Sequence, residues 1–145
     1  MSNYDDTSPQ IVVFTLGGMA FEYDEKKNQK NIAKHGISFR NAARVFFDYD
    51  RIEFYDEEHS KNEDRYNTIG DIGTVKRLEN EKTDRGSIVL GNVNQFIDTV
   101  NDILFVVYTE RKRKESDGMK IDVIRLISAR MATNFERGLF YGKFS

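Results

Sequence analysis

The sequence has no cysteine, no tryptophan, one proline and only two histidines among its 145 residues. The lack of cysteine excludes disulfide bonds, and two histidines alone do not favour a zinc site with nitrogen and sulfur ligands. No apolar run approaches the roughly 20 residues that a membrane-spanning helix needs. The first ten residues are acidic and polar, whereas a signal peptide begins basic and continues apolar. We therefore expect a cytoplasmic protein that makes no contact with a membrane.

Length and charge describe the class of chain. A chain of 145 residues that is 39% hydrophobic and 32% charged is typical of one globular domain, which buries roughly 68% of its unfolded surface. The net charge of −2 argues against indiscriminate binding of nucleic acid. Residues 103–145 nevertheless hold nine Lys and Arg against five Asp and Glu, while residues 1–102 hold 13 against 19. This basic surplus is either a solvated face or an anion-binding surface.

The C-terminal third contains the two most apolar strands that the sequence predicts. Residues 103–108 (ILFVVY) form an unbroken apolar run that is rich in β-branched and aromatic residues, and residues 121–130 form a second strand with Val123, Ile124, Leu126 and Ile127 at its middle. Such runs are typical of strands covered on both faces, so we expect them at the middle of a sheet. Ser116, Asp117 and Gly118 lie between them and are typical of a turn, which predicts a long hairpin.

The N-terminal half predicts a hairpin and two helices. Gly17 and Gly18 separate two apolar runs, at 11–16 and 19–23, as in a two-residue hairpin turn. Asp24 can cap a helix over residues 25–35, whose apolar side is thin and consists of Ile32 and Ala33. Ser38 begins a second predicted helix, which reaches residue 47. Apolar residues at helical spacing give it a core-facing side: Phe39, Ala42, Ala43, Phe46 and Phe47.

The remaining elements alternate between strands and loops. Residues 51–56 alternate apolar and polar side chains as a half-buried strand does, and residues 65–70 form a further strand after an acidic loop at 56–64. We expect a short strand at 87–90 and a short helix at 92–101, with a mobile segment at 74–85 before them. Thr133 to Glu136 form a capping box for a last helix, with an apolar side made of Phe135, Leu139 and Phe140. The sequence thus predicts a single α+β domain with a mainly antiparallel, curved sheet.

Six short motifs follow one another in the order seen in a known toxin family. They are Phe21-Glu22-Tyr23-Asp24, Asn31-Ile32-Ala33-Lys34-His35-Gly36 with Phe39, Asp56 to Ser60 with Arg65, Ile69-Gly70, Val106-Val107-Tyr108-Thr109-Glu110-Arg111, and Ile127-Ser128-Ala129-Arg130. Over about residues 21–70 and 103–137 the chain resembles the BrnT family of bacterial type II toxins. Relative to that family, residues 1–20 are an N-terminal extension and residues 71–102 are an insertion within a single domain of residues 1–145.

This resemblance implies a fold like that of RelE-type ribonucleases, with two N-terminal helices and one C-terminal helix around the sheet. It implies a metal-independent endoribonuclease, without a cofactor, that cleaves RNA and so inhibits translation and growth. A BrnA-like antitoxin encoded beside the toxin would neutralise it, and DNA would be reached only through the complex with the antitoxin. Two alternatives are a non-catalytic module on the same fold that binds protein or RNA, and a structural or assembly protein with the insertion as its interface.

Cutting RNA without a metal needs a base for the 2′-hydroxyl, an acid for the leaving oxygen and cations for the charged phosphorane. Arginine suits the last role because its donors form a fixed fork. We expect Arg65 and Arg130 to hold the scissile phosphate. Because strand residues alternate between faces, Arg125 and Arg130 should point to opposite sides unless a bulge or the strand's end intervenes. Arg125, among apolar neighbours, fits a pair with a buried carboxylate.

Two residues are candidates for proton transfer. His35 is favoured because an imidazole titrates near pH 6.5, although it can also serve as a cation at a helix C-terminus. Glu110 is the other candidate, although with Arg111 it can also form a solvated ion pair. His59, in an acidic loop, is most simply a surface residue. The candidates for catalysis are thus His35, Arg65, Glu110 and Arg130, and those for substrate binding are Lys34, Tyr108 (which stacks a base or packs in the core), Arg111 and Arg125.

Overall fold

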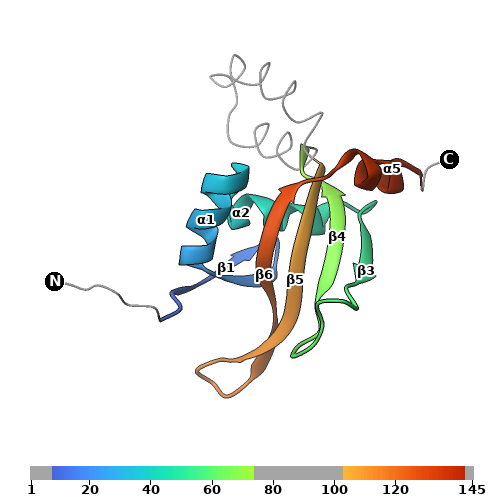
Figure 1. The fold of residues 1–145 in the computed structure, drawn as a ribbon. Coiled ribbons are helices and arrows are strands. Elements are labelled where there is room, and N and C mark those ends of the chain that lie inside the picture. Colours follow the sequence, from blue (N-terminus) through green and yellow to red (C-terminus); the bar gives the residue numbers. More distant parts are fainter. Residues whose placement is uncertain (1–7, 74–102, 143–145) are drawn as a thin grey trace, which may run out of the picture.

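A computed structural model of the 145-residue chain describes residues 8–73 and 103–142, and these form one six-stranded sheet with helices (Figure 1). The strands lie in the order β1-β2-β6-β5-β4-β3. Their bounds are β1 Ile11–Leu16, β2 Met19–Asp24, β3 Ile52–Tyr55, β4 Tyr66–Asp71, β5 Ile103–Lys114 and β6 Lys120–Met131. The helices are α1 Glu25–His35, α2 Phe39–Ala42, the 3₁₀ helix η1 Ala43–Phe47 and α5 Asn134–Gly142. The predicted α+β class is confirmed for these residues.

The two predicted central strands do lie at the middle of the sheet. β5 and β6 pair with each other as a long antiparallel hairpin, and each also has a partner on its other side. Within β5, Ile103, Leu104 and Val106 are at most 1% exposed, as an apolar run buried on both faces should be. The hairpin extends beyond the predicted strands to Lys114 and Lys120.

The sheet is mixed, which corrects part of the predicted topology. β1 and β2 form the expected hairpin at Gly17 and Gly18, both of which have positive φ. β2 then joins the edge of β6 in a parallel ladder at Phe21–Ile124 and Glu22–Arg125. Alternation along a strand predicts its two faces but not its neighbour or direction, so the sequence alone could not show this parallel pair.

The predicted second helix is divided into two parts. Its first turn, α2, is capped by the Ser38 hydroxyl, which accepts a hydrogen bond from the Asn41 backbone at 3.1 Å. Its second part, η1, is tightened into 3₁₀ geometry and ends with a bond from the Asp48 backbone N–H to the Val45 carbonyl. Four of the five predicted apolar positions are still buried: Phe39, Ala42, Ala43 and Phe46.

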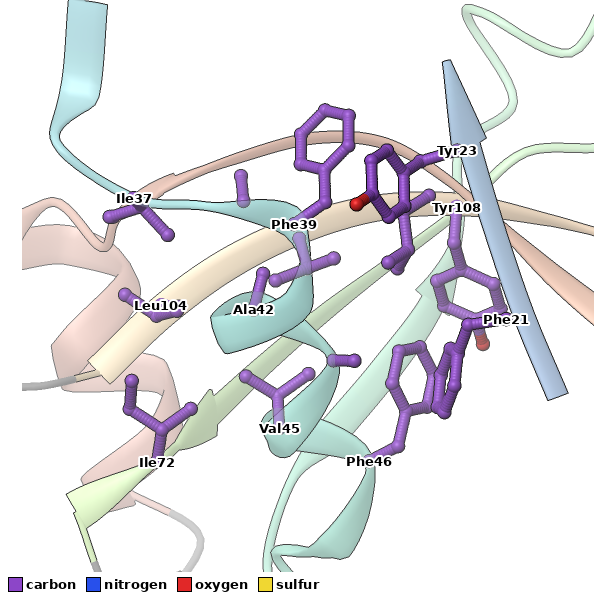
Figure 2. Packing of buried hydrophobic residues seen from close by; sticks show 14 residues of the cluster. Phe21, Tyr23, Ile37, Phe39, Ala42, Val45, Phe46, Ile72, Leu104 and Tyr108 are labelled. Atoms are coloured by element: carbon purple, nitrogen blue, oxygen red, sulfur yellow. The ribbon is translucent and has the colours of Figure 1, made fainter. Parts of the chain in front are cut away.

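These helices and the sheet enclose the main core, which Figure 2 shows at close range. Fourteen buried residues form it, and aromatic rings connect its parts. Phe46 contacts Phe21 on one side and Tyr108 on the other, with ring centroids 5.6 and 4.9 Å apart. The face of the sheet that carries Phe21, Leu126 and Tyr108 is called the helix-covered face below.

Helix α1 is attached to the rest of the fold by buried asparagine side chains. The sequence had predicted a thin apolar side instead. Ile32 and Ala33 are exposed, and the buried residues of α1 are Asn28 and Asn31. Asn31 donates to the Ala129 carbonyl at 2.8 Å and accepts from the Ala129 backbone N–H at 3.2 Å. It therefore completes the edge of β6 beyond the end of the β2 ladder. The helix begins at the Asp24 cap and ends at Gly36 in the left-handed conformation, as predicted.

Helix α5 and strand β3 are more exposed than predicted. The capping box of α5 is confirmed, because Thr133 and Glu136 exchange backbone-to-side-chain bonds of 2.9 and 3.1 Å. Of its predicted apolar side only Phe140 is buried, whereas Phe135 is 75% and Leu139 44% exposed. β3 lies at one edge of the sheet, and only Ile52 of its four residues is even partly buried.

The stretch predicted to be an insertion connects two neighbouring strands. β4 ends at Asp71 and β5 begins at Ile103, and these two residues are register partners. The insertion therefore occupies the place of a hairpin connection. The strand predicted at 87–90, the helix at 92–101 and the mobile segment at 74–85 lie outside the described residues. Within the described part of the chain, the helices are too short or too polar to cross a membrane.

Candidate active site on the open face of the sheet

A bulge in β6 gathers the predicted arginines on one face of the sheet. Val107 pairs with Ser128, but the next residue, Tyr108, pairs with Leu126, which leaves Ile127 without a register partner. Phe105, Val107 and Thr109 share a face by alternation, and their partners are Arg130, Ser128 and Arg125. Arg125 and Arg130 therefore lie on the same side. We call this side, opposite the helix-covered face, the open face.

The open face contains a hollow of about 450 Å³ between β4, β5, β6 and the loop after β3. Its apolar walls come from the central strands, and its charged rim comes from the loop and the strand ends. The lining residues are Asp56, Glu58, His59, Arg65, Asn67, Phe105, Val107, Ile127, Ser128 and Arg130. A second hollow of about 520 Å³ adjoins it and shares Glu58, His59 and Arg65. Together they extend from the central strands onto the loop between β3 and β4.

His59 and Asp56 form a pair at the rim of this hollow. The Nδ1 atom of His59 lies 3.1 and 3.0 Å from the two carboxylate oxygens of Asp56. In the tautomer that carries its proton on Nδ1, the imidazole donates to Asp56 and leaves Nε2 free. The His59 side chain is 62% exposed, so Nε2 can reach a ligand in the hollow. This arrangement of carboxylate, imidazole and free nitrogen is suited to proton transfer.

The loop that carries this pair is fixed at both ends. The Ser60 hydroxyl donates to the Asp56 carbonyl at 2.5 Å and accepts from the Arg65 backbone N–H at 2.9 Å. The Asp56 backbone N–H in turn donates to the Arg65 carbonyl at 2.9 Å. These bonds hold Asp56, Ser60 and Arg65 together at the base of the loop. They thereby fix the position of His59 relative to Arg65.

Arg65 and Arg130 both line the hollow but differ in their partners. The guanidinium of Arg65 makes no hydrogen bond or ion pair with the described residues. Arg130 is held by two bonds of 2.7 and 2.9 Å to Glu136 of α5, and its guanidinium lies 4.3 Å from the centre of the Phe105 ring. The bond between the two side chains raises the pKa of Arg130 and lowers the pKa of Glu136. Arg65 is thus available to an anion, and Arg130 has a fixed orientation in the same hollow.

The other arginines of this face are paired with carboxylates. Glu22, only 4% exposed, accepts from Arg125 at 2.8 Å and from Arg113 at 2.9 Å. The expected pairing of Arg125 with a buried carboxylate is therefore confirmed. Arg111 binds Glu63 at 2.9 Å, and both side chains are partly exposed. The open face thus carries five arginines, of which Arg65 and Arg130 line the hollow.

The first half of this site coincides with a known family. Residues 23–78 match the BrnT ribonuclease toxins of type II toxin–antitoxin systems. The predicted resemblance to BrnT toxins is confirmed over that segment. No curated protein matches the chain. The BrnT match includes Asp56, His59 and Arg65, whereas Arg130 comes from beyond it and is brought to them by the sheet.

The other predicted site residues lie elsewhere. Glu110 pairs with Ile124 in the ladder and so projects from the helix-covered face, and the helix that carries His35 and Lys34 packs against that face too. The sequence suggested His35 or Glu110 as the proton-transfer group that acts with Arg65 and Arg130. The structure does not bring either of them to the hollow that the two arginines line. Tyr108 is 4% exposed and donates to Glu53 at 2.8 Å, so the core alternative for Tyr108 is correct. Burial and this bond raise the pKa of Tyr108.

The sequence reasoning alone did not suggest His59 as a candidate site residue, although the expectation that it lies at the surface agrees with its 62% exposed side chain. It placed His59 in an acidic loop and took that composition as a sign of a surface residue. The signal that could have found it was the spacing, because Asp56 precedes His59 by three residues within one of the BrnT motifs. A carboxylate three residues away can reach an imidazole when the loop turns, as it does here. Among residues 8–73 and 103–142, no three His, Asp or Glu side chains are grouped as ligands of a metal ion would be.

Proposed function

We propose that this chain is an endoribonuclease toxin of a type II toxin–antitoxin system that cleaves RNA without a metal ion. The observation that carries the proposal is the His59–Asp56 pair, which faces the same hollow as Arg65 and Arg130. The match of residues 23–78 to ribonuclease toxins supports the same reaction class. A cytoplasmic place of action follows from the substrate and remains part of the proposal.

The proposed step is an internal transfer of the phosphate. Nε2 of His59 removes the proton of a ribose 2′-hydroxyl, whose oxygen attacks the adjacent phosphorus while the bond from phosphorus to the 5′-oxygen breaks. The products are a 2′,3′-cyclic phosphate and a 5′-hydroxyl, which receives a proton from a second group. Glu58 lines the same hollow and is our candidate for that acid. His35 and Glu110, which the sequence suggested, lie on the helix-covered side and would serve only if the reaction took place there.

The two arginines have complementary roles in this step. Arg65, with no partner among the described residues, binds the phosphate and neutralises the charge that develops on its oxygens. Arg130 donates to the same phosphate from a guanidinium that Glu136 and Phe105 already orient. A donor that is fixed before the reaction stabilises the transition state without a cost of reorganisation. Arg111 and Arg125 extend the cationic band along which the RNA backbone can lie.

The test is cleavage of RNA by the purified protein, with and without EDTA. We expect equal rates in both, and products with a 2′,3′-cyclic phosphate and a 5′-hydroxyl end. Activity that disappears in EDTA and returns with a divalent cation would refute metal independence but not the ribonuclease. No cleavage of any RNA by folded protein, with or without ribosomes, would refute the ribonuclease itself.

The partner that we propose is an antitoxin of the BrnA type that covers the open face. Arg65 and the neighbouring arginines give that face the charge to attract an acidic segment. Charge attraction accelerates association and is screened by salt, so the association rate should fall as ionic strength rises. A rate that does not change between about 50 and 500 mM salt would remove the electrostatic part of this proposal.

One observation favours the alternative of a non-catalytic binding module. Four of the five arginines on the open face already have carboxylate partners within the described residues: Arg111, Arg113, Arg125 and Arg130. Such pairs can organise a docking surface without any chemistry. RNA that binds with a salt-dependent affinity and is never cut would decide for this alternative.

A further inference from the structure

Three residues form a row across the floor of the hollow, from β4 over β5 to β6. Asn67 pairs with Val107 in one ladder, and Val107 pairs with Ser128 in the next. All three line the hollow, so their side chains point to the same face. The row therefore presents an amide, an apolar side chain and a hydroxyl next to one another, between the positions of Arg65 and Arg130.

The polar groups of this row are left unused by the described residues. Asn67 is 7% exposed, and its Oδ1 is buried without a hydrogen-bond partner. It is the one such buried side-chain atom within the described part of the chain. Neither its Nδ2 nor the Ser128 hydroxyl bonds to a described residue. Buried polar atoms are nearly always bonded, and an orphaned one is a sign of a ligand, an ion or a bound water.

The chemistry of the row fits a flat heterocycle with polar edges. Phe105, Val107 and Ile127 provide apolar walls, which suit a ring and do not suit a metal ion or a bare phosphate. An asparagine amide offers one acceptor next to one donor, the pattern with which it reads the edge of a nucleobase. Because neither end of the Asn67 amide has a partner, the amide can turn about its Cβ–Cγ bond and lose no bond.

We propose that the row of Asn67, Val107 and Ser128 is a pocket for one unstacked base of single-stranded RNA, and that Asn67 reads the edge of this base. The proposal rests on the proposed ribonuclease function, because it makes the hollow both the cleavage site and the source of its sequence preference. Arg65 and Arg130 line the same hollow as the row, so the scissile phosphate that they hold in the proposed reaction lies next to this base. Proteins that recognise RNA sequence commonly take single bases out of the stack in this way.

The experiment compares cleavage positions in a pool of random RNA, mapped by sequencing of the product ends. The wild-type protein should prefer one kind of base at one position beside the cut. Asn67→Leu removes both polar groups at similar size and should reduce that preference about ten-fold. Asn67→Asp offers only acceptors and should shift the preference toward guanine, whose N1–H and N2–H donors are adjacent. Asn41→Asp, on the helix-covered side, is the matched control and should leave the pattern unchanged.

Each outcome decides either for or against the pocket. A cleavage pattern that is the same in wild type, Asn67→Leu and Asn67→Asp, at equal melting temperature, would overturn it and assign Asn67 to a bound water. If Asn67→Leu does not fold, Ser128→Ala provides a second variant, which should weaken the same preference while Asn67 remains intact.

A binding measurement separates this inference from the proposed reaction. The side-chain amide signal of Asn67 is followed by NMR in the full chain while each of the four nucleoside monophosphates is added. A shift that is larger for one base than for the others supports the pocket, even if the wild type never cuts RNA. If RNA is cut and the Asn67 signal responds equally weakly to all four, the ribonuclease stands and the base pocket is wrong.

Discussion

The two faces of the sheet are built on different chemistry although they share the same strands. The helix-covered face is a core of 14 buried, mainly aromatic and aliphatic residues under α1, α2 and η1. The open face is covered by α5 only at one end, where Phe140 packs against Ile69 and Ile103. The rest of it carries five arginines, three carboxylate partners and the hollow with His59.

The comparison shows which face stabilises the fold and which face contains groups whose burial is unfavourable. Burial of apolar surface stabilises by about 25 cal/mol for each Å², so the helix-covered face supplies most of the stability. An ion pair that loses water contributes little net stability, yet removal of one partner leaves a buried charge unpaired. A face that keeps Glu22 buried beneath two arginines and Asn67 without a partner is organised for binding rather than for stability.

The largest expected effect is on the rate of RNA cleavage, and it is tested by a comparison of one histidine from each face. His59→Ala should reduce the rate of RNA cleavage by about 10²–10⁴, the usual contribution of one acid or base. The melting temperature should stay the same, because the His59 side chain is 62% exposed. His35→Ala, on the helix α1 of the other face, is the matched control and should retain full activity. Cleavage rates and thermal melting of both variants are the measurements.

The reverse result would exchange the roles of the two faces. If His35→Ala or Glu110→Ala abolishes cleavage while His59→Ala is fully active, the chemistry takes place on the helix-covered face. The hollow would then be a docking surface only, and the assignment of Arg65 and Arg130 to the phosphate would fail with it.

The second effect concerns stability on the open face. Glu22→Ala leaves Arg125, whose side chain is 16% exposed, without its carboxylate. We expect a loss of about 3 kcal/mol in the free energy of unfolding, or about 6–12 °C in melting temperature. Glu63→Ala breaks the exposed pair with Arg111 and should cost at most about 1 kcal/mol. Equal losses for the two variants would mean that burial does not distinguish these pairs.

The third effect concerns the way α1 is attached to the helix-covered face. Asn31→Ala removes both bonds to Ala129 and a third, of 2.9 Å, to the Ile37 carbonyl. The free energy of unfolding, measured in urea, should fall by about 1–3 kcal/mol because buried backbone groups lose their partners. Ile32→Ala in the same helix is the control and should cost less, since Ile32 is 37% exposed. If the Ile32 variant is the less stable one, the helix is held by apolar contact after all.

The sequence predicted those features that follow from local pattern. The unbroken apolar run at the start of β5 and the apolar middle of β6 are typical of central strands, and the glycine pair before β2 is typical of a tight turn. The caps of α1 and α5 follow from Asp24 and from the pair of Thr133 and Glu136. Each of these depends on residues at most a few positions apart, so the chain needs no distant partner to specify them.

The features that the sequence did not predict depend on distant partners. The bulge at Ile127 moves Arg125 and Arg130 to one face. No nearby residue type in the sequence indicates that β6 has one unpaired residue at this point. Asn31 is polar and therefore reads as a solvated helix position, but Ala129, 98 residues away, makes it a buried one. His59 needed both the turn of its loop and the strands below it before its role could be proposed.

The smallest expected effect is a difference in pH dependence at the end of the open face where α5 packs. The bond from Arg130 lowers the pKa of Glu136 below its ordinary value of 4.5 in the folded protein. The charged carboxylate is therefore favoured by folding, and its contribution is complete above about pH 4.5 and is lost as the pH falls through the lowered value. Glu136→Gln keeps an oxygen that can accept from the Thr133 backbone, so it removes the charge while it retains the cap.

We expect wild type and variant to differ in unfolding free energy by a constant amount of about 1 kcal/mol between pH 5 and 7. The difference should shrink as the pH falls below 4.5 and through the lowered pKa of Glu136, where urea unfolding of both proteins measures it. A difference that stays constant at every pH below 4.5 at which both proteins fold would show that Glu136 acts through its size and cap alone, and that Arg130 is oriented by Phe105 rather than by its carboxylate.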